Sequence, residues 1–490
     1  MTCDARPVPG ARAGRSGRFA PIRRLARGGT VVATVAASLL GLARPRLAGA
    51  QEGQGRPPYR LLRAEEDYAF LRDGSAAEPD LWDPIKFIPL NRSGSIFITL
   101  GGEIRPRVEF FDNRGWAMGR ESYYSQRLAL HAAANLGGRV RLFGELYHGL
   151  LTQEEKEVTQ DDKLDLHQGF VEVDLPLARR HQLRFRLGRQ ELAYGAARLV
   201  GIREGPNIRR AFDAGRVTYG GPGLSIDAVL GGEVIPLFEV FDNHRNRSML
   251  FWGVFSRLSV LPGPGMTEIY YFGIDFDEAR YNDGIAPETR HTFGVRRFGE
   301  IGRSARYNTE VVLQVGTFGD KRITAFAVET DYHYRFTGMR FRPELGIKLD
   351  YVSGDREHGD NRLNTFNPLF PNPAYFGLLG QITPMNLVDV HPSIALELAD
   401  QVDVVADWDV FWRASTQDGL YAPPRFLDRE GQNVEPRYIG HQPSFELQYR
   451  IDRHATWSFE GSYFVSGSFI QASGDAPNIL HLASTLSYRF

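Results

Sequence analysis

Apolar and polar residues alternate with a period of two along most of the chain. In SFELQYRI (444–451), Phe445, Leu447 and Tyr449 alternate with Glu446 and Gln448. Such a period predicts β-strands with one apolar and one polar face. The pattern predicts eighteen strands, at residues 95–111, 122–135, 139–151, 164–175, 182–192, 212–220, 224–234, 248–259, 267–278, 288–299, 305–318, 322–336, 341–353, 393–399, 401–413, 438–452, 454–467 and 478–490.

The links between these strands alternate in length. Even-numbered strands are followed by short links, at 135–138, 220–223, 261–265, 337–339 and 452–453. Odd-numbered strands are followed by longer ones, at 152–163, 193–211, 235–247, 354–392 and 414–437, with the short link 319–321 as an exception. Short periplasmic turns and long extracellular loops are typical of outer-membrane barrels.

A soluble all-β protein also alternates, with its polar face in solvent. However, several predicted strands contain twelve or more residues, whereas soluble strands average about 5–6 residues and tilted membrane strands need about 9–11. We therefore expect an all-β fold, a single transmembrane antiparallel up-and-down barrel of about 18 strands, over residues 95–490. An even strand number places both ends of the barrel on the periplasmic side.

The first fifty residues have the character of an export signal. They contain nine Arg, a single acid (Asp4), the apolar run TVVATVAASLLGLA (30–43) and the small-residue pattern Ala48-Gly49-Ala50. We expect a signal peptide over 1–50, with a general secretory signal favoured over the twin-arginine type suggested by Arg23-Arg24. The alternative is a membrane anchor, but the run is shorter than the ~20 residues of a spanning helix.

Removal of residues 1–50 changes the composition. It leaves 49 basic residues (58 − 9) against 58 acidic residues (59 − 1), so the net charge of the mature chain becomes −9. The only cysteine, Cys3, leaves with the signal, so we expect no disulfide. Residues 51–94 lack a clean strand pattern and are expected to form a periplasmic lead-in, with a short helix at 64–72 and some order against the barrel floor.

The final segment, LHLASTLSYRF (480–490), alternates to its end. Leu480, Leu482, Leu486 and Tyr488 are expected to face lipid, and the strand to pair with the first strand and close the barrel. Phe490 would lie in the aromatic girdle at the periplasmic interface. This ending also resembles the terminal signal that such barrels present to the barrel assembly machinery, which we expect as a partner.

Several segments resemble the alginate export family of outer-membrane barrels. They are LWDPIKFIPL (81–90), RLGRQELAYGAARLVGIREGPNIRRAFDAGRV (186–217), SGDREHGDNRLNTFNPLFPNPAYFG (353–377) with NLVDVHPSIALEL (386–398), DWDVFWRASTQDGLY (407–421) and the terminal strand. The resemblance covers essentially the whole mature chain. It implies an 18-stranded barrel and a positively charged conduit for an anionic, alginate-like polysaccharide.

The candidate binding residues are arginines expected in the lumen. Residues 179–216 contain ten Arg and three acids, a local charge of +7. Arginine binds carboxylates through a planar fork and stays charged, so scattered inward arginines suit a moving polyuronate. By strand register or loop position, the expected contacts are Arg184, Arg186, Arg198, Arg203, Arg209, Arg210 and Arg216. Arg179 and Arg180, in a periplasmic turn, are expected to be solvated.

Further inward candidates are Arg105, Arg107, Arg296 and Lys348. For Arg105 and Arg107 an alternative is simple neutralisation by Glu103 and Glu109. The loop 354–392, with Phe366, Phe370 and Tyr375, is either a constriction over the mouth or a surface cap packed on itself. Carboxylates at 353–361 lack the ligand spacing of a calcium loop, so no metal and no cofactor is expected.

The resulting hypothesis is a passive outer-membrane channel for an anionic exopolysaccharide. The alternative is a diffusion porin for small carboxylates or sugar acids. An enzyme is disfavoured, because the chain has no G-x-S-x-G, H-E-x-x-H or phosphate-binding glycine loop. Expected partners are the polysaccharide, outer-membrane lipid and periplasmic export proteins, with no nucleic acid and a monomeric state.

Overall fold

The computed structural model describes residues 56–74, 79–153, 155–177, 180–259 and 261–490. They all belong to one compact unit of the chain, residues 36–490. The predicted signal peptide lies outside the described residues, so its cleavage stays a prediction. Within the described part of the chain, no helix has both the length and the apolar character to cross a membrane.

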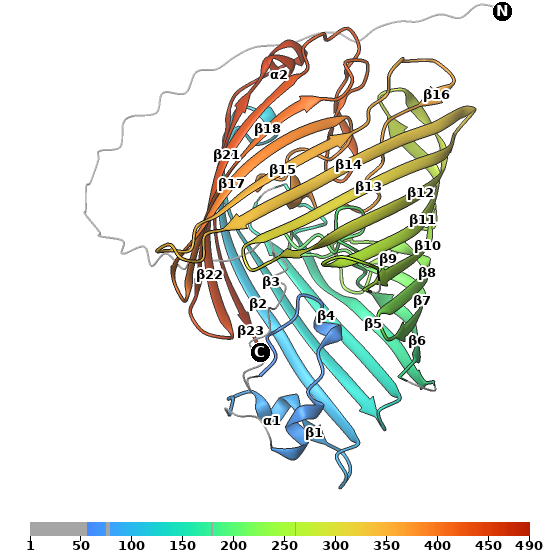
Figure 1. Ribbon diagram of the computed structural model, residues 1–490, viewed down its shortest axis with the longest axis vertical. Helices are drawn as coiled ribbons and strands as arrows, with labels where there is room; N and C mark the ends of the chain where they lie inside the picture. The colour runs from blue at the N-terminus through green and yellow to red at the C-terminus, as the bar shows by residue number, and fades with distance from the viewer. Residues whose placement is uncertain (1–55, 75–78, 154, 178–179, 260) are drawn as a thin grey trace, which may run out of the picture. The chain divides into compact units, whose positions relative to one another are not determined.

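Eighteen antiparallel strands close into one barrel, which confirms the predicted fold (Figure 1). The barrel strands are β2 (Ile96–Asp112), β3 (Arg120–Leu136), β4 (Val140–Leu151), β5 (Asp162–Pro176), β6 (Gln182–Gln190), β7 (Phe212–Gly221), β8 (Leu224–Ile235), β10 (Met249–Leu258), β11 (Met266–Tyr281), β12 (Gly284–Ile301), β13 (Ala305–Phe318), β14 (Lys321–Arg335), β15 (Glu344–Val352), β17 (Leu387–Ala399), β18 (Val402–Arg413), β21 (Tyr438–Arg450), β22 (Ala455–Ser466) and β23 (Ile479–Arg489). Closure comes from β23 pairing with β2, with Ile104 opposite Tyr488.

Shorter elements supplement the wall. The short strands are β1 (Ile88–Pro89), β9 (His244–Arg245), β16 (Arg362–Leu363), β19 (Leu420–Ala422) and β20 (Phe426–Arg429). The helices are the 3-10 turns η1 (Arg63–Glu65), η2 (Ala69–Asp73), η3 (Arg114–Trp116) and η4 (Pro373–Phe376), and the α-helices α1 (Asp83–Lys86) and α2 (Ser468–Ser473).

One strand begins earlier than its pattern predicts. The predicted strand 393–399 is the second half of β17, which already starts at Leu387. Pro392 hides this continuity, because a proline within a run normally argues against a central strand. Here Pro392 pairs with Ile347 of β15, while the pairing of β17 with β18 is interrupted between Val390 and Ser393. The position of Pro392, which has no backbone N–H, therefore coincides with the gap in the hydrogen bonding between β17 and β18.

The two faces of the wall differ as the alternation predicts. On β13, Val311, Leu313 and Val315 are exposed on the outer face, whereas Glu310 and Gln314 are buried on the inner face. The apolar outer face matches a hydrocarbon environment, and backbone pairing around the closed sheet satisfies the N–H and C=O groups there.

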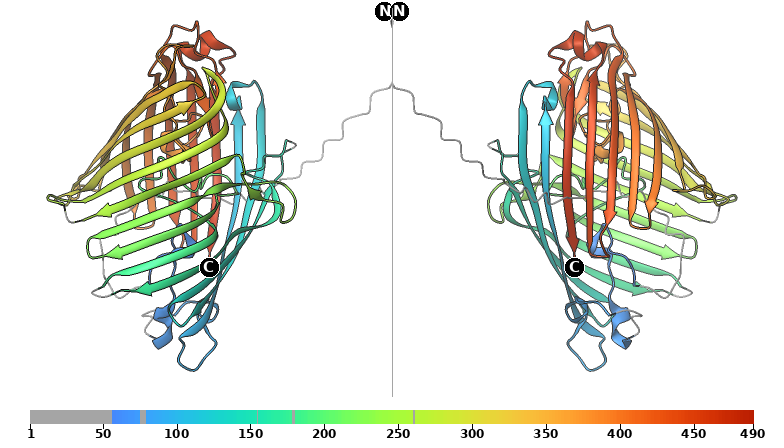
Figure 2. Two further views of the ribbon diagram at one scale, coloured as in Figure 1. Left: turned by 90° about the vertical axis from the view of Figure 1, so that its right-hand side faces the viewer. Right: turned by 90° about the vertical axis from the view of Figure 1, so that its left-hand side faces the viewer.

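The two ends of the barrel carry different connections. We call one the short-turn end, which has the links 137–139, 222–223, 302–304 and 400–401. The other is the long-loop end, which has 191–211, 353–386 and 414–437, although two links on this side, 282–283 and 319–320, are short. The segment before β2 and the C-terminal end of β23 lie together at the short-turn end (Figure 2).

Two of the long loops fold into the barrel, and we call residues 191–211 the first inward loop and 353–386 the second. They meet at a bridge between Val200 and Phe370, where Gly201 N donates to Phe370 O at 2.9 Å. Phe370 packs edge-to-face on Phe212 and Phe251 of the inner wall. The second inward loop therefore lies within the lumen and is not a cap packed only on itself.

The lead-in also reaches the lumen, in a form that differs from the prediction. The predicted helix at 64–72 is wrong: η1 and η2 are separate 3-10 turns. Two backbone carbonyls that a continuous helix would use internally, Ala64 O and Glu66 O, accept hydrogen bonds from Arg141 of the wall instead. Just before them, Leu61 O accepts from Arg209 of the first inward loop. Tertiary contacts with arginine thus replace helical ones.

The lead-in is held against both strands of the closure. Arg63 donates to Gly102 O of β2 and to Phe490 O beyond β23, each at 3.0 Å. Trp82 stacks on Phe490 at a centroid distance of 4.5 Å and donates to Tyr488 Oη at 2.9 Å. Phe490 is thus enclosed by the lead-in at the short-turn end.

Lys86 makes this docking pH-dependent. Its buried Nζ donates to Leu100 O at 2.9 Å and lies 5.0 Å from the centre of the Tyr68 ring. Burial, aided by the positive charge of Arg63, lowers the pKa of Lys86 from 10.5 to about 7. Between about pH 7 and pH 10.5, Lys86 is protonated in the undocked lead-in but largely neutral in the docked one. Docking should therefore strengthen with rising pH in this window, by at most ~1.4 kcal/mol per pH unit.

Hydrogen exchange of residues 56–74 and 79–94, corrected for the intrinsic rate at each pH, measures this effect. Protection should rise between about pH 7 and 9 in the wild type and stay level in Lys86→Met. Equal pH profiles in the two proteins would refute the assignment to Lys86.

Candidate functional site

The polar inner face of β5–β8 brings arginines together near the short-turn end. Arg186 of β6 lies directly opposite Arg216 of β7 in the strand register. Like charges in such positions repel, so each has an acidic partner. Arg186 Nε donates to Glu172 Oε2 at 2.8 Å, and Arg216 Nε donates to Asp227 Oδ1 at 3.0 Å.

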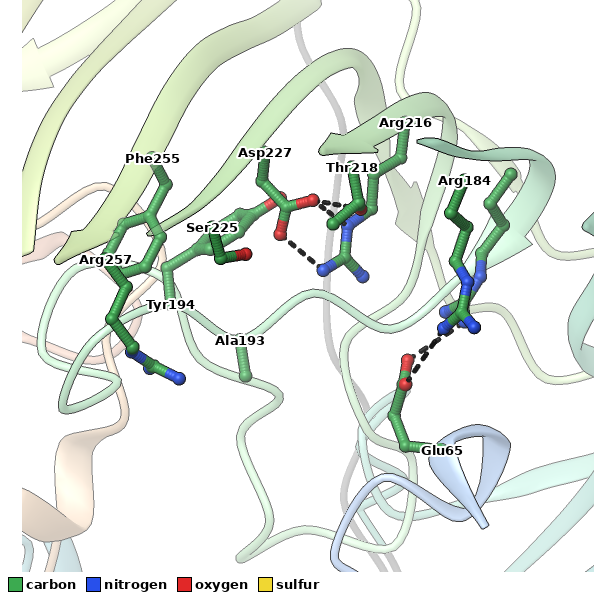
Figure 3. Close-up of a pocket in the computed structure, with 11 residues that line it drawn as sticks. Glu65, Arg184, Ala193, Tyr194, Arg216, Thr218, Ser225, Asp227, Phe255 and Arg257 are labelled. Atoms are coloured by element: carbon green, nitrogen blue, oxygen red, sulfur yellow. Dashed lines mark hydrogen bonds and ion pairs between the residues drawn. The ribbon is translucent and has the colours of Figure 1, made fainter. Parts of the chain in front are cut away.

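A cavity of ≈ 220 Å³ opens at this arginine pair, and we call it the arginine cavity. Its lining comes from the wall, the first inward loop and η1: Glu65, Arg184, Arg186, Ala193, Tyr194, Arg216, Thr218, Ser225, Asp227, Phe255 and Arg257 (Figure 3). Four guanidinium groups and two carboxylates line the cavity, and three further carboxylates, those of Glu172, Asp174 and Glu268, pair with the arginines from behind the lining. An anion can therefore contact these arginines only in competition with their acidic partners.

Three of these guanidinium groups remain partly accessible. The side chains of Arg184, Arg216 and Arg257 are 30%, 20% and 46% exposed. Arg184 forms a two-pronged contact with Asp174, at 2.7 and 3.0 Å. Arg257 approaches Glu268 at 2.7 Å and lies across the cavity from Arg184. A carboxylate ligand would share these cations with their present acidic partners.

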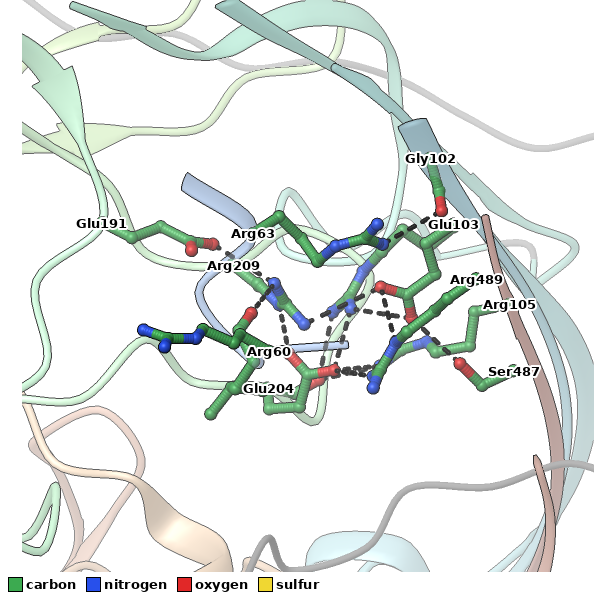
Figure 4. A network of polar contacts seen from close by, with 12 residues as sticks. Arg60, Arg63, Gly102, Glu103, Arg105, Glu191, Glu204, Arg209, Ser487 and Arg489 are labelled. Atoms are coloured by element: carbon green, nitrogen blue, oxygen red, sulfur yellow. Dashed lines mark hydrogen bonds and ion pairs between the residues drawn. The ribbon is translucent and has the colours of Figure 1, made fainter. Parts of the chain in front are cut away.

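A second network of charges joins the first inward loop to the wall. Figure 4 shows Arg63, Arg105, Arg209 and Arg489 around Glu103 and Glu204. Arg127 adds a contact to Glu204 Oε1 at 3.0 Å. Burial would raise the pKa of Glu204, but the neighbouring Arg127 and Arg209 hold it at about 2. Glu204 is therefore ionised and ties the loop to β2 and β3.

The predicted site residues divide between these places. Arg184, Arg186 and Arg216 line the arginine cavity, whereas Arg105 and Arg209 belong to the buried network around Glu204. Arg107 contacts Glu109 at 3.1 Å and Glu460 at 3.4 Å. Neutralisation by Glu109 therefore describes the present contacts of Arg107, whereas Arg105 contacts Glu204 of the first inward loop and not the expected Glu103.

The remaining predicted residues lie in protein-filled parts of the lumen. Arg198 contacts Glu310 at 3.2 Å and Asp331 at 3.0 Å, and Arg210 contacts Glu233 at 2.8 Å. The other three residues are also bound by protein groups: Arg296 contacts Glu268, Arg203 donates to Ile208 O and Lys348 donates to Tyr375 O. Burial, with the charge of Arg210, lowers the pKa of Arg203 to about 10.

Sequence reasoning missed Arg257 and Arg127. Both carry a signal that the alternation supplies. Arg257 follows Phe255 by two residues on β10, and Arg127 follows Ser125 by two on β3, so each shares the inward face of its strand. Neither lies within the arginine-rich stretch 179–216.

Comparison with known proteins agrees with this architecture. The family model described as "Alginate export" matches residues 97–478. Among curated proteins, none matches the sequence at a significant level. Three solved structures from Pseudomonas aeruginosa share the fold, each covering 80% of this chain and 98% of their own. They are OccK2 (OpdF) in complex with glucuronate (11% identity, TM-score 0.54), OccK8 (OprE) (13%, 0.54) and OpdK with vanillate (11%, 0.51).

Proposed function

Since this chain belongs to the alginate export family and forms an outer-membrane channel barrel, we propose that it conducts an anionic exopolysaccharide out of the cell. The polymer is of the polyuronate class, with about one carboxylate per sugar. The observation that carries the proposal is the arginine cavity, where four arginines gather and the side chains of three of them are partly exposed.

The location of the cavity supports an entrance role. Short turns of outer-membrane barrels face the periplasm, so the arginine cavity lies on the side from which a secreted polymer arrives. Arg184 and Arg216 already hold Asp174 and Asp227. A passing carboxylate must compete with these partners, so it binds weakly enough to move on. The four arginines thus act as an initial, reversible contact.

Passage of a chain also requires room beyond the cavity. The two inward loops meet across the lumen through Val200 and Phe370, and η1 contributes Glu65 to the cavity lining. In the proposed mechanism, the inward loops withdraw toward the long-loop end while the wall stays closed. The arginine cavity then continues into the space that the loops leave.

A second candidate function is the uptake of small sugar acids. The cavity is smaller than the ~300–1,000 Å³ of typical drug-sized ligand pockets, which suits one uronate unit better than a chain segment. The structure of OccK2 in complex with glucuronate provides a precedent on the same fold. In this alternative the inward loops stay in place and restrict passage to monomers.

The joint variant Arg184→Gln, Arg216→Gln, Arg257→Gln tests the proposal in planar bilayers. We expect the wild type to select anions and to be blocked by a polyuronate added on the periplasmic side. The variant should shift its reversal potential toward cations and need at least ~10-fold more polymer for the same block, because charge-assisted hydrogen bonds contribute about 1.5–3 kcal/mol each.

The matched control is Arg450→Gln. Arg450 is also ion-paired near the short-turn end, with Asp403, and its side chain is 28% exposed, but it does not line the arginine cavity. It should leave polymer block unchanged. Free permeation of glucuronate without any block by polymer would favour the uptake alternative, and cation selectivity of the wild type would exclude both.

A further inference from the structure

An acidic cluster lies on the inner wall away from the arginine cavity. It consists of Asp350 on β15, Asp389 and His391 on β17, and Asp409 on β18, and we call it the aspartate–histidine cluster. Asp350 and Asp389 are directly opposite each other in the strand register. One ligand atom each from Asp389, His391 and Asp409 lie within 4.8 Å of one another.

Two carboxylates of this cluster lack hydrogen-bond donors. Both oxygens of Asp350 and of Asp389 have no hydrogen-bond partner among the described residues, although these side chains are only 3% and 1% exposed. Buried carboxylates are normally hydrogen-bonded, paired with a cation or bound to a metal. The imidazole of His391 lies closest, with its Nδ1 against Asp409 and 4.0 Å from Asp389.

The local charge balance leaves a deficit of positive charge. Asp407 also faces His391, at 3.6 Å, so the cluster and its neighbour hold four carboxylates. The facing cations are His391, when protonated, and Lys348, which is opposite His391 in the register and donates to Tyr375 O at 2.9 Å. Arg198 also attracts Asp350, but it is paired with Glu310 and Asp331. The remaining groups sum to −2, which one divalent cation would neutralise.

The second inward loop encloses the cluster. A side chain built on Gly377 would bring its Cβ within 3.1 Å of Asp409 Oδ2 and 2.8 Å of Gln442 Nε2. Gly377 has a φ of +112°, a backbone conformation that favours glycine. The loop backbone thus approaches the carboxylate of Asp409 as closely as a glycine allows.

A second acid–histidine cluster on the same wall provides an internal comparison. Glu145, His167 and Glu191 also place three ligand atoms within 4.8 Å. There, however, Gln168 donates to Glu145 at 2.7 Å, and His167 lies 3.0 Å from Glu191. Protein groups already form hydrogen bonds to those carboxylates, whereas Asp350 and Asp389 have no hydrogen-bond partner among the described residues.

We propose that Asp389, His391 and Asp409, with Asp350 beside them, form a binding site for one divalent transition-metal cation of the Zn²⁺ or Mn²⁺ type. Imidazole nitrogen combined with carboxylate oxygen suits these ions, whereas Ca²⁺ favours six to eight oxygen ligands. Ligand atoms with bonds of about 2.0–2.2 Å to one tetrahedral ion are roughly 3.4 Å apart, so Asp389 would approach His391 from its present 4.0 Å and Asp409 would move slightly away from it. All of these ligands lie on the wall, and Gly377 of the second inward loop lies beside Asp409, so an ion that orders Asp409 also orders the loop residues next to it.

Metal binding to the full-length, untagged protein in detergent tests this site. After treatment with a chelator, the protein is dialysed against Zn²⁺, Mn²⁺ or Ca²⁺ and the bound metal is measured by mass spectrometry. We expect one Zn²⁺ or Mn²⁺ per chain. The variant His391→Gln should lower the affinity at least ~10-fold, while the matched variant His167→Gln should retain wild-type binding. Resistance of the barrel to unfolding in mild detergent confirms that each variant is folded.

A second readout follows the loop. Adding the metal should slow hydrogen exchange across residues 374–386 in the wild type and in His167→Gln, but not in His391→Gln or in Asp389→Asn, Asp409→Asn. The proposal is overturned if the wild type binds neither Zn²⁺ nor Mn²⁺, if it binds only Ca²⁺, or if His391→Gln binds as the wild type does. Loss of the ion in His167→Gln alone would assign it to the other cluster.

Discussion

Replacement of Phe370 by Ala is expected to raise the conductance of the reconstituted channel strongly. Phe370 is buried at the centre of the contact between the inward loops, 4.9 Å from the ring of Phe212 and 5.2 Å from that of Phe251. Truncating a buried phenylalanine costs about 3–5 kcal/mol. If loop docking loses that free energy, the ratio of withdrawn to docked loops rises by roughly two to four orders of magnitude.

Single-channel recording measures this change directly, as longer or more frequent open periods at the same voltage. The control is Phe426→Ala, since Phe426 lies in β20 of a long-loop connection and is 67% exposed. This control should keep the wild-type conductance. Unchanged conductance in Phe370→Ala, with increased hydrogen exchange in both inward loops, would mean that these loops do not limit ion flow.

The second large effect is expected from Glu204→Gln. Glu204 accepts from Arg127 and Arg209 in a buried site. Its amide replacement keeps the size but removes the charge, so several guanidinium groups would share Glu103 and Glu191. Breaking a buried ion network by removing one partner costs about 3–5 kcal/mol. Residues 191–211 should therefore lose protection from hydrogen exchange.

An exposed ion pair supplies the contrast. Glu239 contacts Lys163 at 2.6 Å, with both side chains more than half exposed. Glu239→Gln should change the same exchange rates by no more than ~1 kcal/mol in opening free energy. Comparable effects of the two substitutions would show that the buried network adds no specific stability to the first inward loop.

The barrel wall could be predicted because its physics is local. Along QLRFRLGRQ, each position faces the side opposite to its neighbour, so Arg184 and Arg186 are directed inward wherever β6 lies in the barrel. The same rule directs Arg257 of β10 inward, although Arg257 lies outside the arginine-rich stretch of the sequence.

The filling of the lumen could not be predicted in this way. Val200 and Phe370 are 170 positions apart and meet only because both loops turn inward. Nothing in TFNPLFP distinguishes an aromatic segment packed inside a barrel from one packed on top of it. Likewise, the acidic partners of Arg198, on β13 and β14, become visible only when the loop is placed. These contacts depend on tertiary distance, which alternation does not encode.

The contacts of Arg63 have a consequence for how the barrel is completed. Gly102 and Phe490, whose carbonyl groups Arg63 binds together, become neighbours only when β2 and β23 have paired. The binding surface for the lead-in is therefore absent from an open sheet and present in a closed one. By linkage, whatever free energy the lead-in gains by docking also opposes separation of these two strands. The lead-in thus stabilises the pairing of β2 with β23, and in a barrel without the lead-in these two strands should separate first.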